Sequence, residues 1–213
     1  MKKTNAFYLV SLLLSAILFS CQGNNRQPGG DNKPQPNETP VVGGQGLITD
    51  AGQLPDIINY EGNFQQAARW PGQGSNYYAI VSKLEQGDFF SPSWSSRLNF
   101  YLFEVNGGQI ISRRAFQAES PNIYSTVDIK GGQSQLVSLP SMGTAFSVVY
   151  SICPDGEDPC SIFSSVIGTD GKYDFQILEN VGRAVYLEAQ DAMMAGIPED
   201  VRQHMLKQLF GME

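Results

Sequence analysis

Short runs of β-branched and aromatic residues, separated by glycine-rich turns, are the feature that most restricts the fold of this chain. Residues 106–109 read Asn-Gly-Gly-Gln and join two such runs, 98–105 and 109–116. Two glycines between β-rich runs are typical of a tight hairpin turn. Residues 130–133, Lys-Gly-Gly-Gln, are similar and follow the run 123–129. We therefore predict a hairpin turn at each place.

Four further runs of the same kind predict strands at residues 77–84, 145–153, 161–167 and 173–178. Turn residues separate them, and no helices alternate with them as a parallel sheet would require. The sequence therefore predicts a mainly β fold, an antiparallel sandwich or barrel-like sheet. Residues 47–70 fit neither a strand nor a helix pattern clearly, and we assign them no element.

The C-terminal residues change from a strand pattern to a helix pattern. Apolar side chains recur every four residues from Ile197 to Leu209, and Gly211 follows as a helix-ending residue. Pro198 suits the first position of a helix, where its missing N–H is not needed. We predict an amphipathic C-terminal helix packed on the sheet, and a second helical stretch over residues 189–195.

Three cysteines are present, and two of them, Cys153 and Cys160, lie in the β-rich region. An even pair in an exported domain predicts a structural disulfide. If the two cysteines face each other across a hairpin, Tyr150 lies opposite Phe163 and residue 146 opposite residue 167. This register would gather apolar side chains on one face of the hairpin and leave the disulfide on the other.

The loop between these cysteines carries three acidic residues, Asp155, Glu157 and Asp158. Clustered carboxylates can bind calcium, but the full spacing of a calcium-binding loop is absent. We read the loop as a solvated acidic hairpin tip. One histidine, His204, and a paired set of cysteines leave too few ligands for zinc, so no metal or other cofactor is predicted. We expect His204 to be a packed or half-exposed helix residue.

The sequence lacks the common motifs of catalysis. The nucleophile motif Gly-x-Ser-x-Gly does not occur, since the nearest match, residues 139–143, begins with Leu139. Neither Ser-x-x-Lys nor a phosphate-binding glycine loop is present. A pair of catalytic carboxylates leaves no local signature, so a hydrolase stays an alternative. We expect binding rather than catalysis.

Two tryptophans lie among turn residues, Trp70 before Pro71-Gly72 and Trp94 between two serines. Aromatic side chains on loops can stack on sugar rings or anchor a protein partner. The other reading is that they close the ends of the hydrophobic core. We favour core packing for both residues and keep Trp70 and Trp94 as candidate ligand contacts.

The first 21 residues have the composition of an export signal. Lys2 and Lys3 precede an apolar run, residues 6–19, that is shorter than the roughly 20 residues of a membrane-spanning helix. The sequence Leu18-Phe19-Ser20-Cys21 resembles the lipobox of bacterial lipoproteins. The resemblance implies cleavage before Cys21 and a diacylglyceryl group on its thiol. Gln22, which is not aspartate, implies by the same resemblance transfer to the outer membrane.

Residues 22–46 contain four prolines and six glycines with few large apolar side chains. Such a segment buries too little apolar surface to offset its ordering entropy. We predict a signal peptide over 1–20, the anchor cysteine with a disordered linker over 21–46, and a single β-rich domain over 47–213.

The chain expected after cleavage has 12 basic and 21 acidic residues, a formal charge of −9. This charge repels phosphate backbones, so we expect no nucleic-acid partner. The sequence predicts a lipid-anchored envelope protein whose domain, in the periplasm or at the cell surface, binds another envelope protein or a cell-wall glycan. The alternatives are a saccharide-binding module that uses exposed aromatics, and an unrecognised hydrolase.

Overall fold

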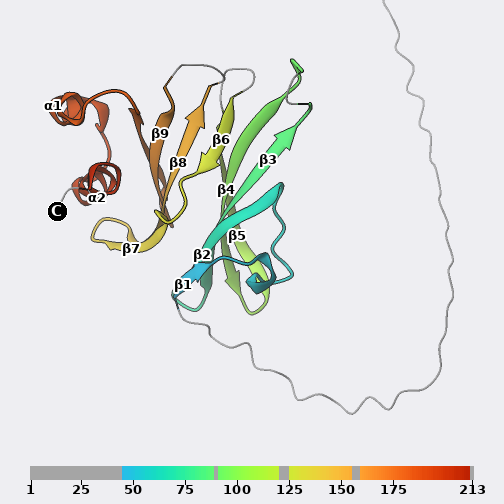
Figure 1. The fold of residues 1–213 in the computed structure, drawn as a ribbon. Coiled ribbons are helices and arrows are strands. Elements are labelled where there is room, and N and C mark those ends of the chain that lie inside the picture. The colour runs from blue at the N-terminus through green and yellow to red at the C-terminus, as the bar shows by residue number, and fades with distance from the viewer. Residues whose placement is uncertain (1–44, 89–90, 120–124, 155–158, 212–213) are drawn as a thin grey trace, which may run out of the picture. The chain divides into compact units, whose positions relative to one another are not determined.

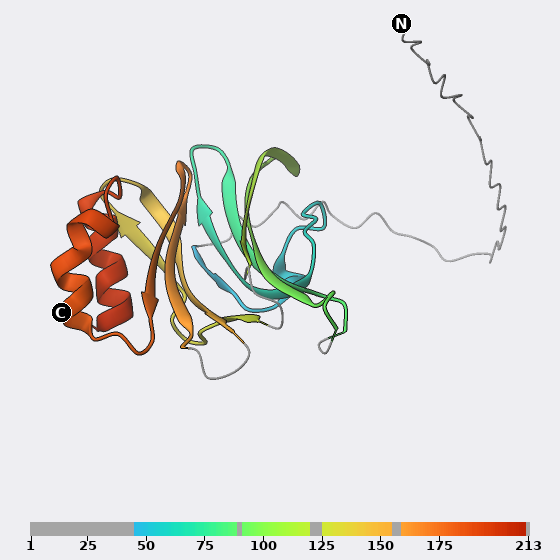
Figure 2. The ribbon, with the colours of Figure 1, turned by 90° about the horizontal axis from the view of Figure 1, so that it is seen from above.

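The computed structural model describes residues 45–88, 91–119, 125–154 and 159–211. Two antiparallel sheets pack face to face, and two helices lie on the outer face of the second sheet (Figures 1 and 2). The predicted mainly β fold with a C-terminal helix is therefore confirmed, in its sandwich form.

The first sheet is an antiparallel meander in which every strand pairs with the next one along the chain. Its strands are β1 (Gly46–Ile48), β2 (Asn63–Pro71), β3 (Asn76–Gln86), β4 (Ser95–Asn106) and β5 (Gln109–Glu119), with a short 3-10 helix, η1 (Ala51–Gln53), between the first two. Asn106 pairs with Gln109, which confirms the predicted hairpin turn between β4 and β5. β1 and β2 fall in the stretch that the sequence left unassigned.

The second sheet consists of β6 (Thr126–Ile129), β7 (Gln135–Leu139), β8 (Gly143–Cys153), β9 (Ser161–Gly168) and β10 (Gly171–Leu178). Its strands follow the order β10-β9-β8-β6, with β7 also paired to β8, so β10 is an edge strand. Tyr150 lies opposite Phe163, and their rings stack with centroids 4.8 Å apart. The register predicted from the two cysteines is therefore confirmed, as is the Cys153–Cys160 disulfide.

The predicted hairpin turn at residues 130–133 is wrong. β6 and β7 do not pair with each other, because both pair with the same edge of β8 and run in the same direction. From Ile129 to Gln135 the chain advances six residues while the partner position moves three, from Tyr150 to Ser147. The glycines therefore form a three-residue bulge in one interrupted strand, and not a reversal of the chain.

The main core lies between the two sheets. The strand period of two sends alternate side chains of β8 to opposite faces. Phe146, Val148 and Tyr150 point into the sandwich, against Phe100 and Leu98 of β4. All five are essentially buried. This is the apolar face that the register argument predicted.

Both outer faces of the sandwich are also covered. On the first sheet, the segment between β1 and β2 packs buried Ile58 and partly buried Tyr60 against Tyr78 and Tyr101. On the second sheet the cover is helical: α1 (Arg183–Met193) and α2 (Glu199–Phe210). The domain therefore has four layers in order: the segment before β2, the first sheet, the second sheet and the two helices.

The helix boundaries differ a little from the prediction. Pro198 caps α2 from just outside the helix instead of occupying its first position. Gly211 ends it in the left-handed conformation, with φ of 62°, as expected for a C-cap. α1 begins six residues before the predicted stretch 189–195, because its apolar contacts, such as Tyr186, lie near its start.

Candidate binding groove beside strand β10

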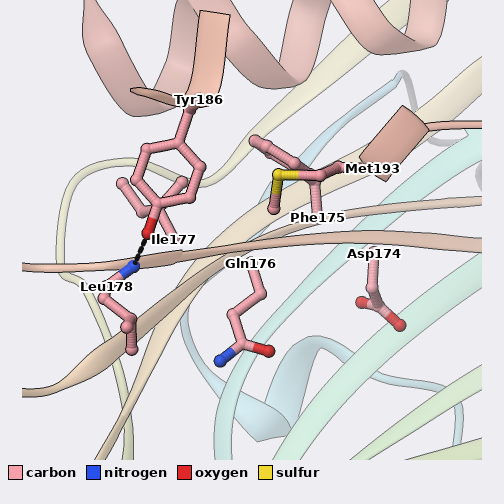
Figure 3. Close-up of a pocket in the computed structure, with 7 residues that line it drawn as sticks. All are labelled: Asp174, Phe175, Gln176, Ile177, Leu178, Tyr186 and Met193. Atoms are coloured by element: carbon pink, nitrogen blue, oxygen red, sulfur yellow. Dashed lines mark hydrogen bonds between the residues drawn. The ribbon is translucent and has the colours of Figure 1, made fainter. Parts of the chain in front are cut away.

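A groove of about 460 Å³ runs along the outer edge of β10, beneath α1 (Figure 3). Five consecutive strand residues and two helix residues line it: Asp174, Phe175, Gln176, Ile177, Leu178, Tyr186 and Met193. The groove exists because β10 is the last strand of its sheet and α1 lies beside it. It therefore combines backbone groups of a sheet edge with side chains of a helix.

The direction of the backbone groups follows from two hydrogen bonds at the end of β10. Glu179 N–H donates to the carbonyl oxygen of Cys160, just before β9, at 3.0 Å, and Leu178 N–H donates to the Tyr186 hydroxyl at 2.6 Å (Figure 3). Adjacent residues of a strand direct their backbone groups to opposite edges. Since the β9–β10 register is regular, Gln176 and Asp174 direct N–H and C=O into the groove, as Leu178 does.

The wall of the groove on the helix side is apolar. Phe175 and Tyr186 are buried and meet edge to face with ring centroids 6.3 Å apart. Met193 is 48% exposed on α1 and forms the outer part of this wall (Figure 3). An apolar side chain that entered here would be covered by these groups.

A buried cation lies on the sandwich side of the same strand. The Lys172 side chain is 5% exposed, and its Nζ is 2.6 Å from Asp174 Oδ1 and 4.5 Å from the centre of the Phe100 ring. Ser165 donates a hydrogen bond to the Asp174 carboxylate. Burial, and then the nearby Asp174 charge, raises the pKa of the Tyr150 phenol well above its ordinary value of 10. In this cluster Asp174 neutralises the charge of Lys172. The Ser165 hydroxyl is fully buried, so it is not placed to attack a substrate.

A second polar cluster joins α2 to the outer face of the second sheet. Ser147 and Ser164 donate to Gln208 Oε1 at 2.9 and 2.7 Å, and Gln208 Nε2 donates to Gln133 O at 2.6 Å. His204 Nε2 lies 2.8 Å from Ser147 Oγ. Gln208 thus satisfies a carbonyl of the three-residue bulge, and the cluster fixes the helix on the sheet.

His204 is half-buried on α2, as the sequence analysis expected. Desolvation by burial, and then the charge of Lys207, lowers the pKa of its imidazole. Within the described part of the chain, no group of three or more His, Cys, Asp and Glu side chains is placed to hold a metal ion.

The two tryptophans lie in different environments. Trp70 is 2% exposed in the main core, where it stacks on Tyr77 with centroids 5.8 Å apart. Trp70 therefore has the core position that is one of the two interpretations of its sequence, because β2 continues through it and turns its ring inward. Trp94 is half-buried, and its indole N–H donates to Ser125 O at 3.3 Å.

Other predicted features lie outside the described residues. These are the lipobox with Cys21, the linker up to residue 44, and the three acidic residues of the 154–159 loop. Among the helices that the structure describes, none is long and apolar enough to cross a membrane.

Sequence reasoning missed the groove beside β10. Its strand was predicted, but strand order was not, and only strand order makes β10 an edge. The exposed polar residues Asp174 and Gln176, which alternate with buried Phe175 and Ile177, read as an ordinary half-buried strand.

No protein-family model, curated protein or solved structure matches this chain.

Proposed function

We propose that this chain is a bacterial lipoprotein, anchored by lipid on Cys21, whose domain binds another component of the cell envelope without catalysing a reaction. The lipobox-like residues 18–21 support the anchor, and Gln22 favours the outer membrane. Several acyl chains on one cysteine bind a bilayer far more firmly than one chain, which alone is marginal. Residues 22–46 then act as a spacer between the membrane and the domain.

The groove beside β10 is the observation that favours binding. It offers backbone groups that point away from β9 on one side and apolar side chains, including Met193, on the other. Pockets that combine an apolar wall with a few polar groups are typical of binding sites. The two polar clusters do not favour catalysis. Their serines, Ser165 and Ser147, are buried and hold the surrounding elements together.

Saccharide binding through aromatic residues has less support. Trp70 is unavailable to a ligand, and the Trp94 indole already donates to a backbone carbonyl. A sugar platform needs an exposed ring face, usually with polar groups beside it. Trp94 is the residue on which this alternative depends.

The test is cross-linked capture of the full-length, lipidated protein from the envelope of cells that produce it. We expect one protein partner, recovered in amounts that saturate as the level of tagged chain rises. A Trp94→Ala variant is the matched control, and it should capture the same partner. Retention of cell-wall glycan that Trp94→Ala abolishes, with no protein recovered, would favour the saccharide module instead. Turnover of an envelope substrate would favour a hydrolase.

A further inference from the structure

We propose that the groove beside β10 binds an extended polypeptide segment of another envelope protein, which adds to the second sheet as a further strand. This inference rests on the proposed binding function and names the chemistry of the partner.

The backbone groups of β10 set the first requirement. Asp174 and Gln176 direct N–H and C=O away from β9, and neither N–H donates to a group of the described residues. Outward groups two residues apart along a strand are about 6.8 Å apart. Paired donors and acceptors at that spacing are matched by the backbone of another extended chain.

Tyr186 shows how an acceptor fits at this edge. Its hydroxyl accepts the Leu178 N–H at 2.6 Å from the side of the groove, in the place where a carbonyl of an added strand would lie (Figure 3). At the other end of β10 the buried Lys172 side chain points inward. An inward-pointing charge on an edge strand discourages pairing with a further strand. The open stretch is therefore short, centred on Asp174 and Gln176, and suits a segment of a few residues.

The apolar wall sets the second requirement. Side chains of an added strand alternate between the two faces of the sheet. Those on the helix side would meet Met193 and Phe175, and those on the other side would meet the exposed side chains of Gln176 and Leu178 (Figure 3). The partner segment should therefore carry apolar residues at alternate positions.

Charge argues against a second copy of this chain as the occupant. The chain after Cys21 cleavage carries a formal charge of −9, so two copies repel each other. The groove itself holds Asp174, whose charge Lys172 offsets, and Glu179 lies exposed at its end. A partner segment without net negative charge fits best.

The other sheet also has a long edge strand, but its features oppose strand addition. β5 has a register irregularity opposite Glu104 and carries two exposed arginines, Arg113 and Arg114. Bulges and charged side chains protect an edge from pairing. Exposed Ile111 on β5 therefore offers a matched control position for the groove.

The experiment places the photoreactive residue p-benzoylphenylalanine at Met193 or, as the control, at Ile111 in the full-length lipidated chain. The two side chains are comparably exposed, at 48% and 57%. Irradiation in the native envelope should link the Met193 position, and not the Ile111 position, to a partner protein. Mass spectrometry of the product should locate the link in one short segment with alternate apolar residues.

A backbone variant tests the strand geometry. Gln176→Pro removes an outward N–H and leaves the pairing with β9 in place, since proline is tolerated at such edge positions. It should lower the cross-link yield by about tenfold, whereas Gln176→Ala, which keeps the N–H, should lower it by no more than about threefold. Met193→Lys changes the apolar wall and leaves the backbone unchanged. With the photoreactive residue placed at Leu178 instead, this variant should also lower the cross-link yield. Its matched control is Ile111→Lys.

The outcomes separate this inference from the proposed function. An equal yield for Gln176→Pro and Gln176→Ala, with the fold shown intact by an unchanged thermal midpoint, would overturn strand addition. A partner linked from Ile111 alone would keep the binding function and overturn the groove. A product of two copies of this chain would overturn the choice of occupant. Failure of both positions and of the general cross-linked capture would contradict the proposed function itself.

Discussion

Trp70 and Trp94 illustrate at the residue scale how burial decides the role of an aromatic side chain. Replacing a buried tryptophan with alanine removes its transfer free energy and leaves a cavity. We expect Trp70→Ala to lower the free energy of unfolding by about 3–5 kcal/mol. Trp94→Ala should lower the free energy of unfolding less, by about 1–2 kcal/mol, since the half-buried ring has fewer contacts to lose and one hydrogen bond. Urea unfolding of both variants measures the difference, and equal losses would contradict the assignment of Trp70 to the core.

Lys172 is a second residue whose surroundings define its effect. Lys172→Met keeps the apolar stem but removes the cation that pairs with Asp174. Breaking a buried pair leaves a carboxylate uncompensated. Because Asp174 is itself partly exposed, we expect a loss of about 1–3 kcal/mol, below the value for a fully buried pair. Chemical denaturation provides the measurement, with exposed Lys207→Met as the control. A loss no larger than that of the control would show that the pair is not stabilising.

His204 predicts how stability depends on pH. Burial lowers its folded-state pKa below the ordinary 6.5, so the folded state favours the neutral imidazole. Its contribution is therefore complete above pH 6.5 and declines as the pH falls from there toward the folded-state value. Thermal unfolding between pH 7.5 and 5.5 should show a falling midpoint, and His204→Gln should flatten the fall. An unchanged slope in that variant would assign the effect to other groups.

The β8–β9 hairpin is the element whose stability depends most on a covalent bond. The Cys153–Cys160 bridge closes a loop of eight residues. By the chain-entropy relation, removing it with Cys153→Ser and Cys160→Ser should cost about 2.5 kcal/mol. Urea unfolding of the double variant, compared with the oxidised parent domain, measures this cost, and the reduced parent should resemble the double variant. A double variant as stable as the oxidised parent would refute the entropic contribution.

The same hairpin explains which elements could be predicted from sequence. Two cysteines and an alternating apolar pattern specify one register, so the pairing of Tyr150 with Phe163 followed from residues alone. The glycines at 131–132 carry no such second constraint. Their signal is common to hairpins and bulges, and the decision depends on β8, which follows later in the chain. Local signals therefore predict that a chain bends, and long-range pairing decides where it goes.

The segment before β2 was missed for a related reason. Ile58 and Tyr60 lie in a stretch without a helix or strand period, since that stretch covers a sheet as an irregular chain. Their burial depends on the apolar outer face of β3 and β4, which no local pattern reveals. The groove at β10 was equally hidden, because it arises from strand order and from the position of α1.

Across the described domain, the layered arrangement leaves few sheet faces open to a partner. Sheet faces are covered by a neighbouring sheet, by the N-terminal segment or by helices. The strands at the ends of the sheets stay open at their edges, and β10 is one such edge strand with a groove beside it. An edge site binds through backbone groups, so its specificity would come from a few side chains and from location. The proposed lipid anchor would supply location, because it would confine the domain and the proposed partner to one membrane surface and raise their effective concentration.

If the proposed anchor is present, its loss should decide whether the domain meets its proposed partner. Cys21→Ser removes the thiol that the lipid would modify, and each acyl CH₂ lost costs about 0.8 kcal/mol of membrane binding. We expect the variant to incorporate no labelled palmitate and to move from the membrane fraction to the soluble fraction.

The domain itself should be unaffected, with the same thermal midpoint as the parent domain, because the anchor lies outside it. Cys160→Ser is the control, since it should retain the label while losing the disulfide. Continued palmitate labelling of Cys21→Ser would show that the resemblance to the lipobox is misleading, and the partner would then have to be sought among freely diffusing proteins.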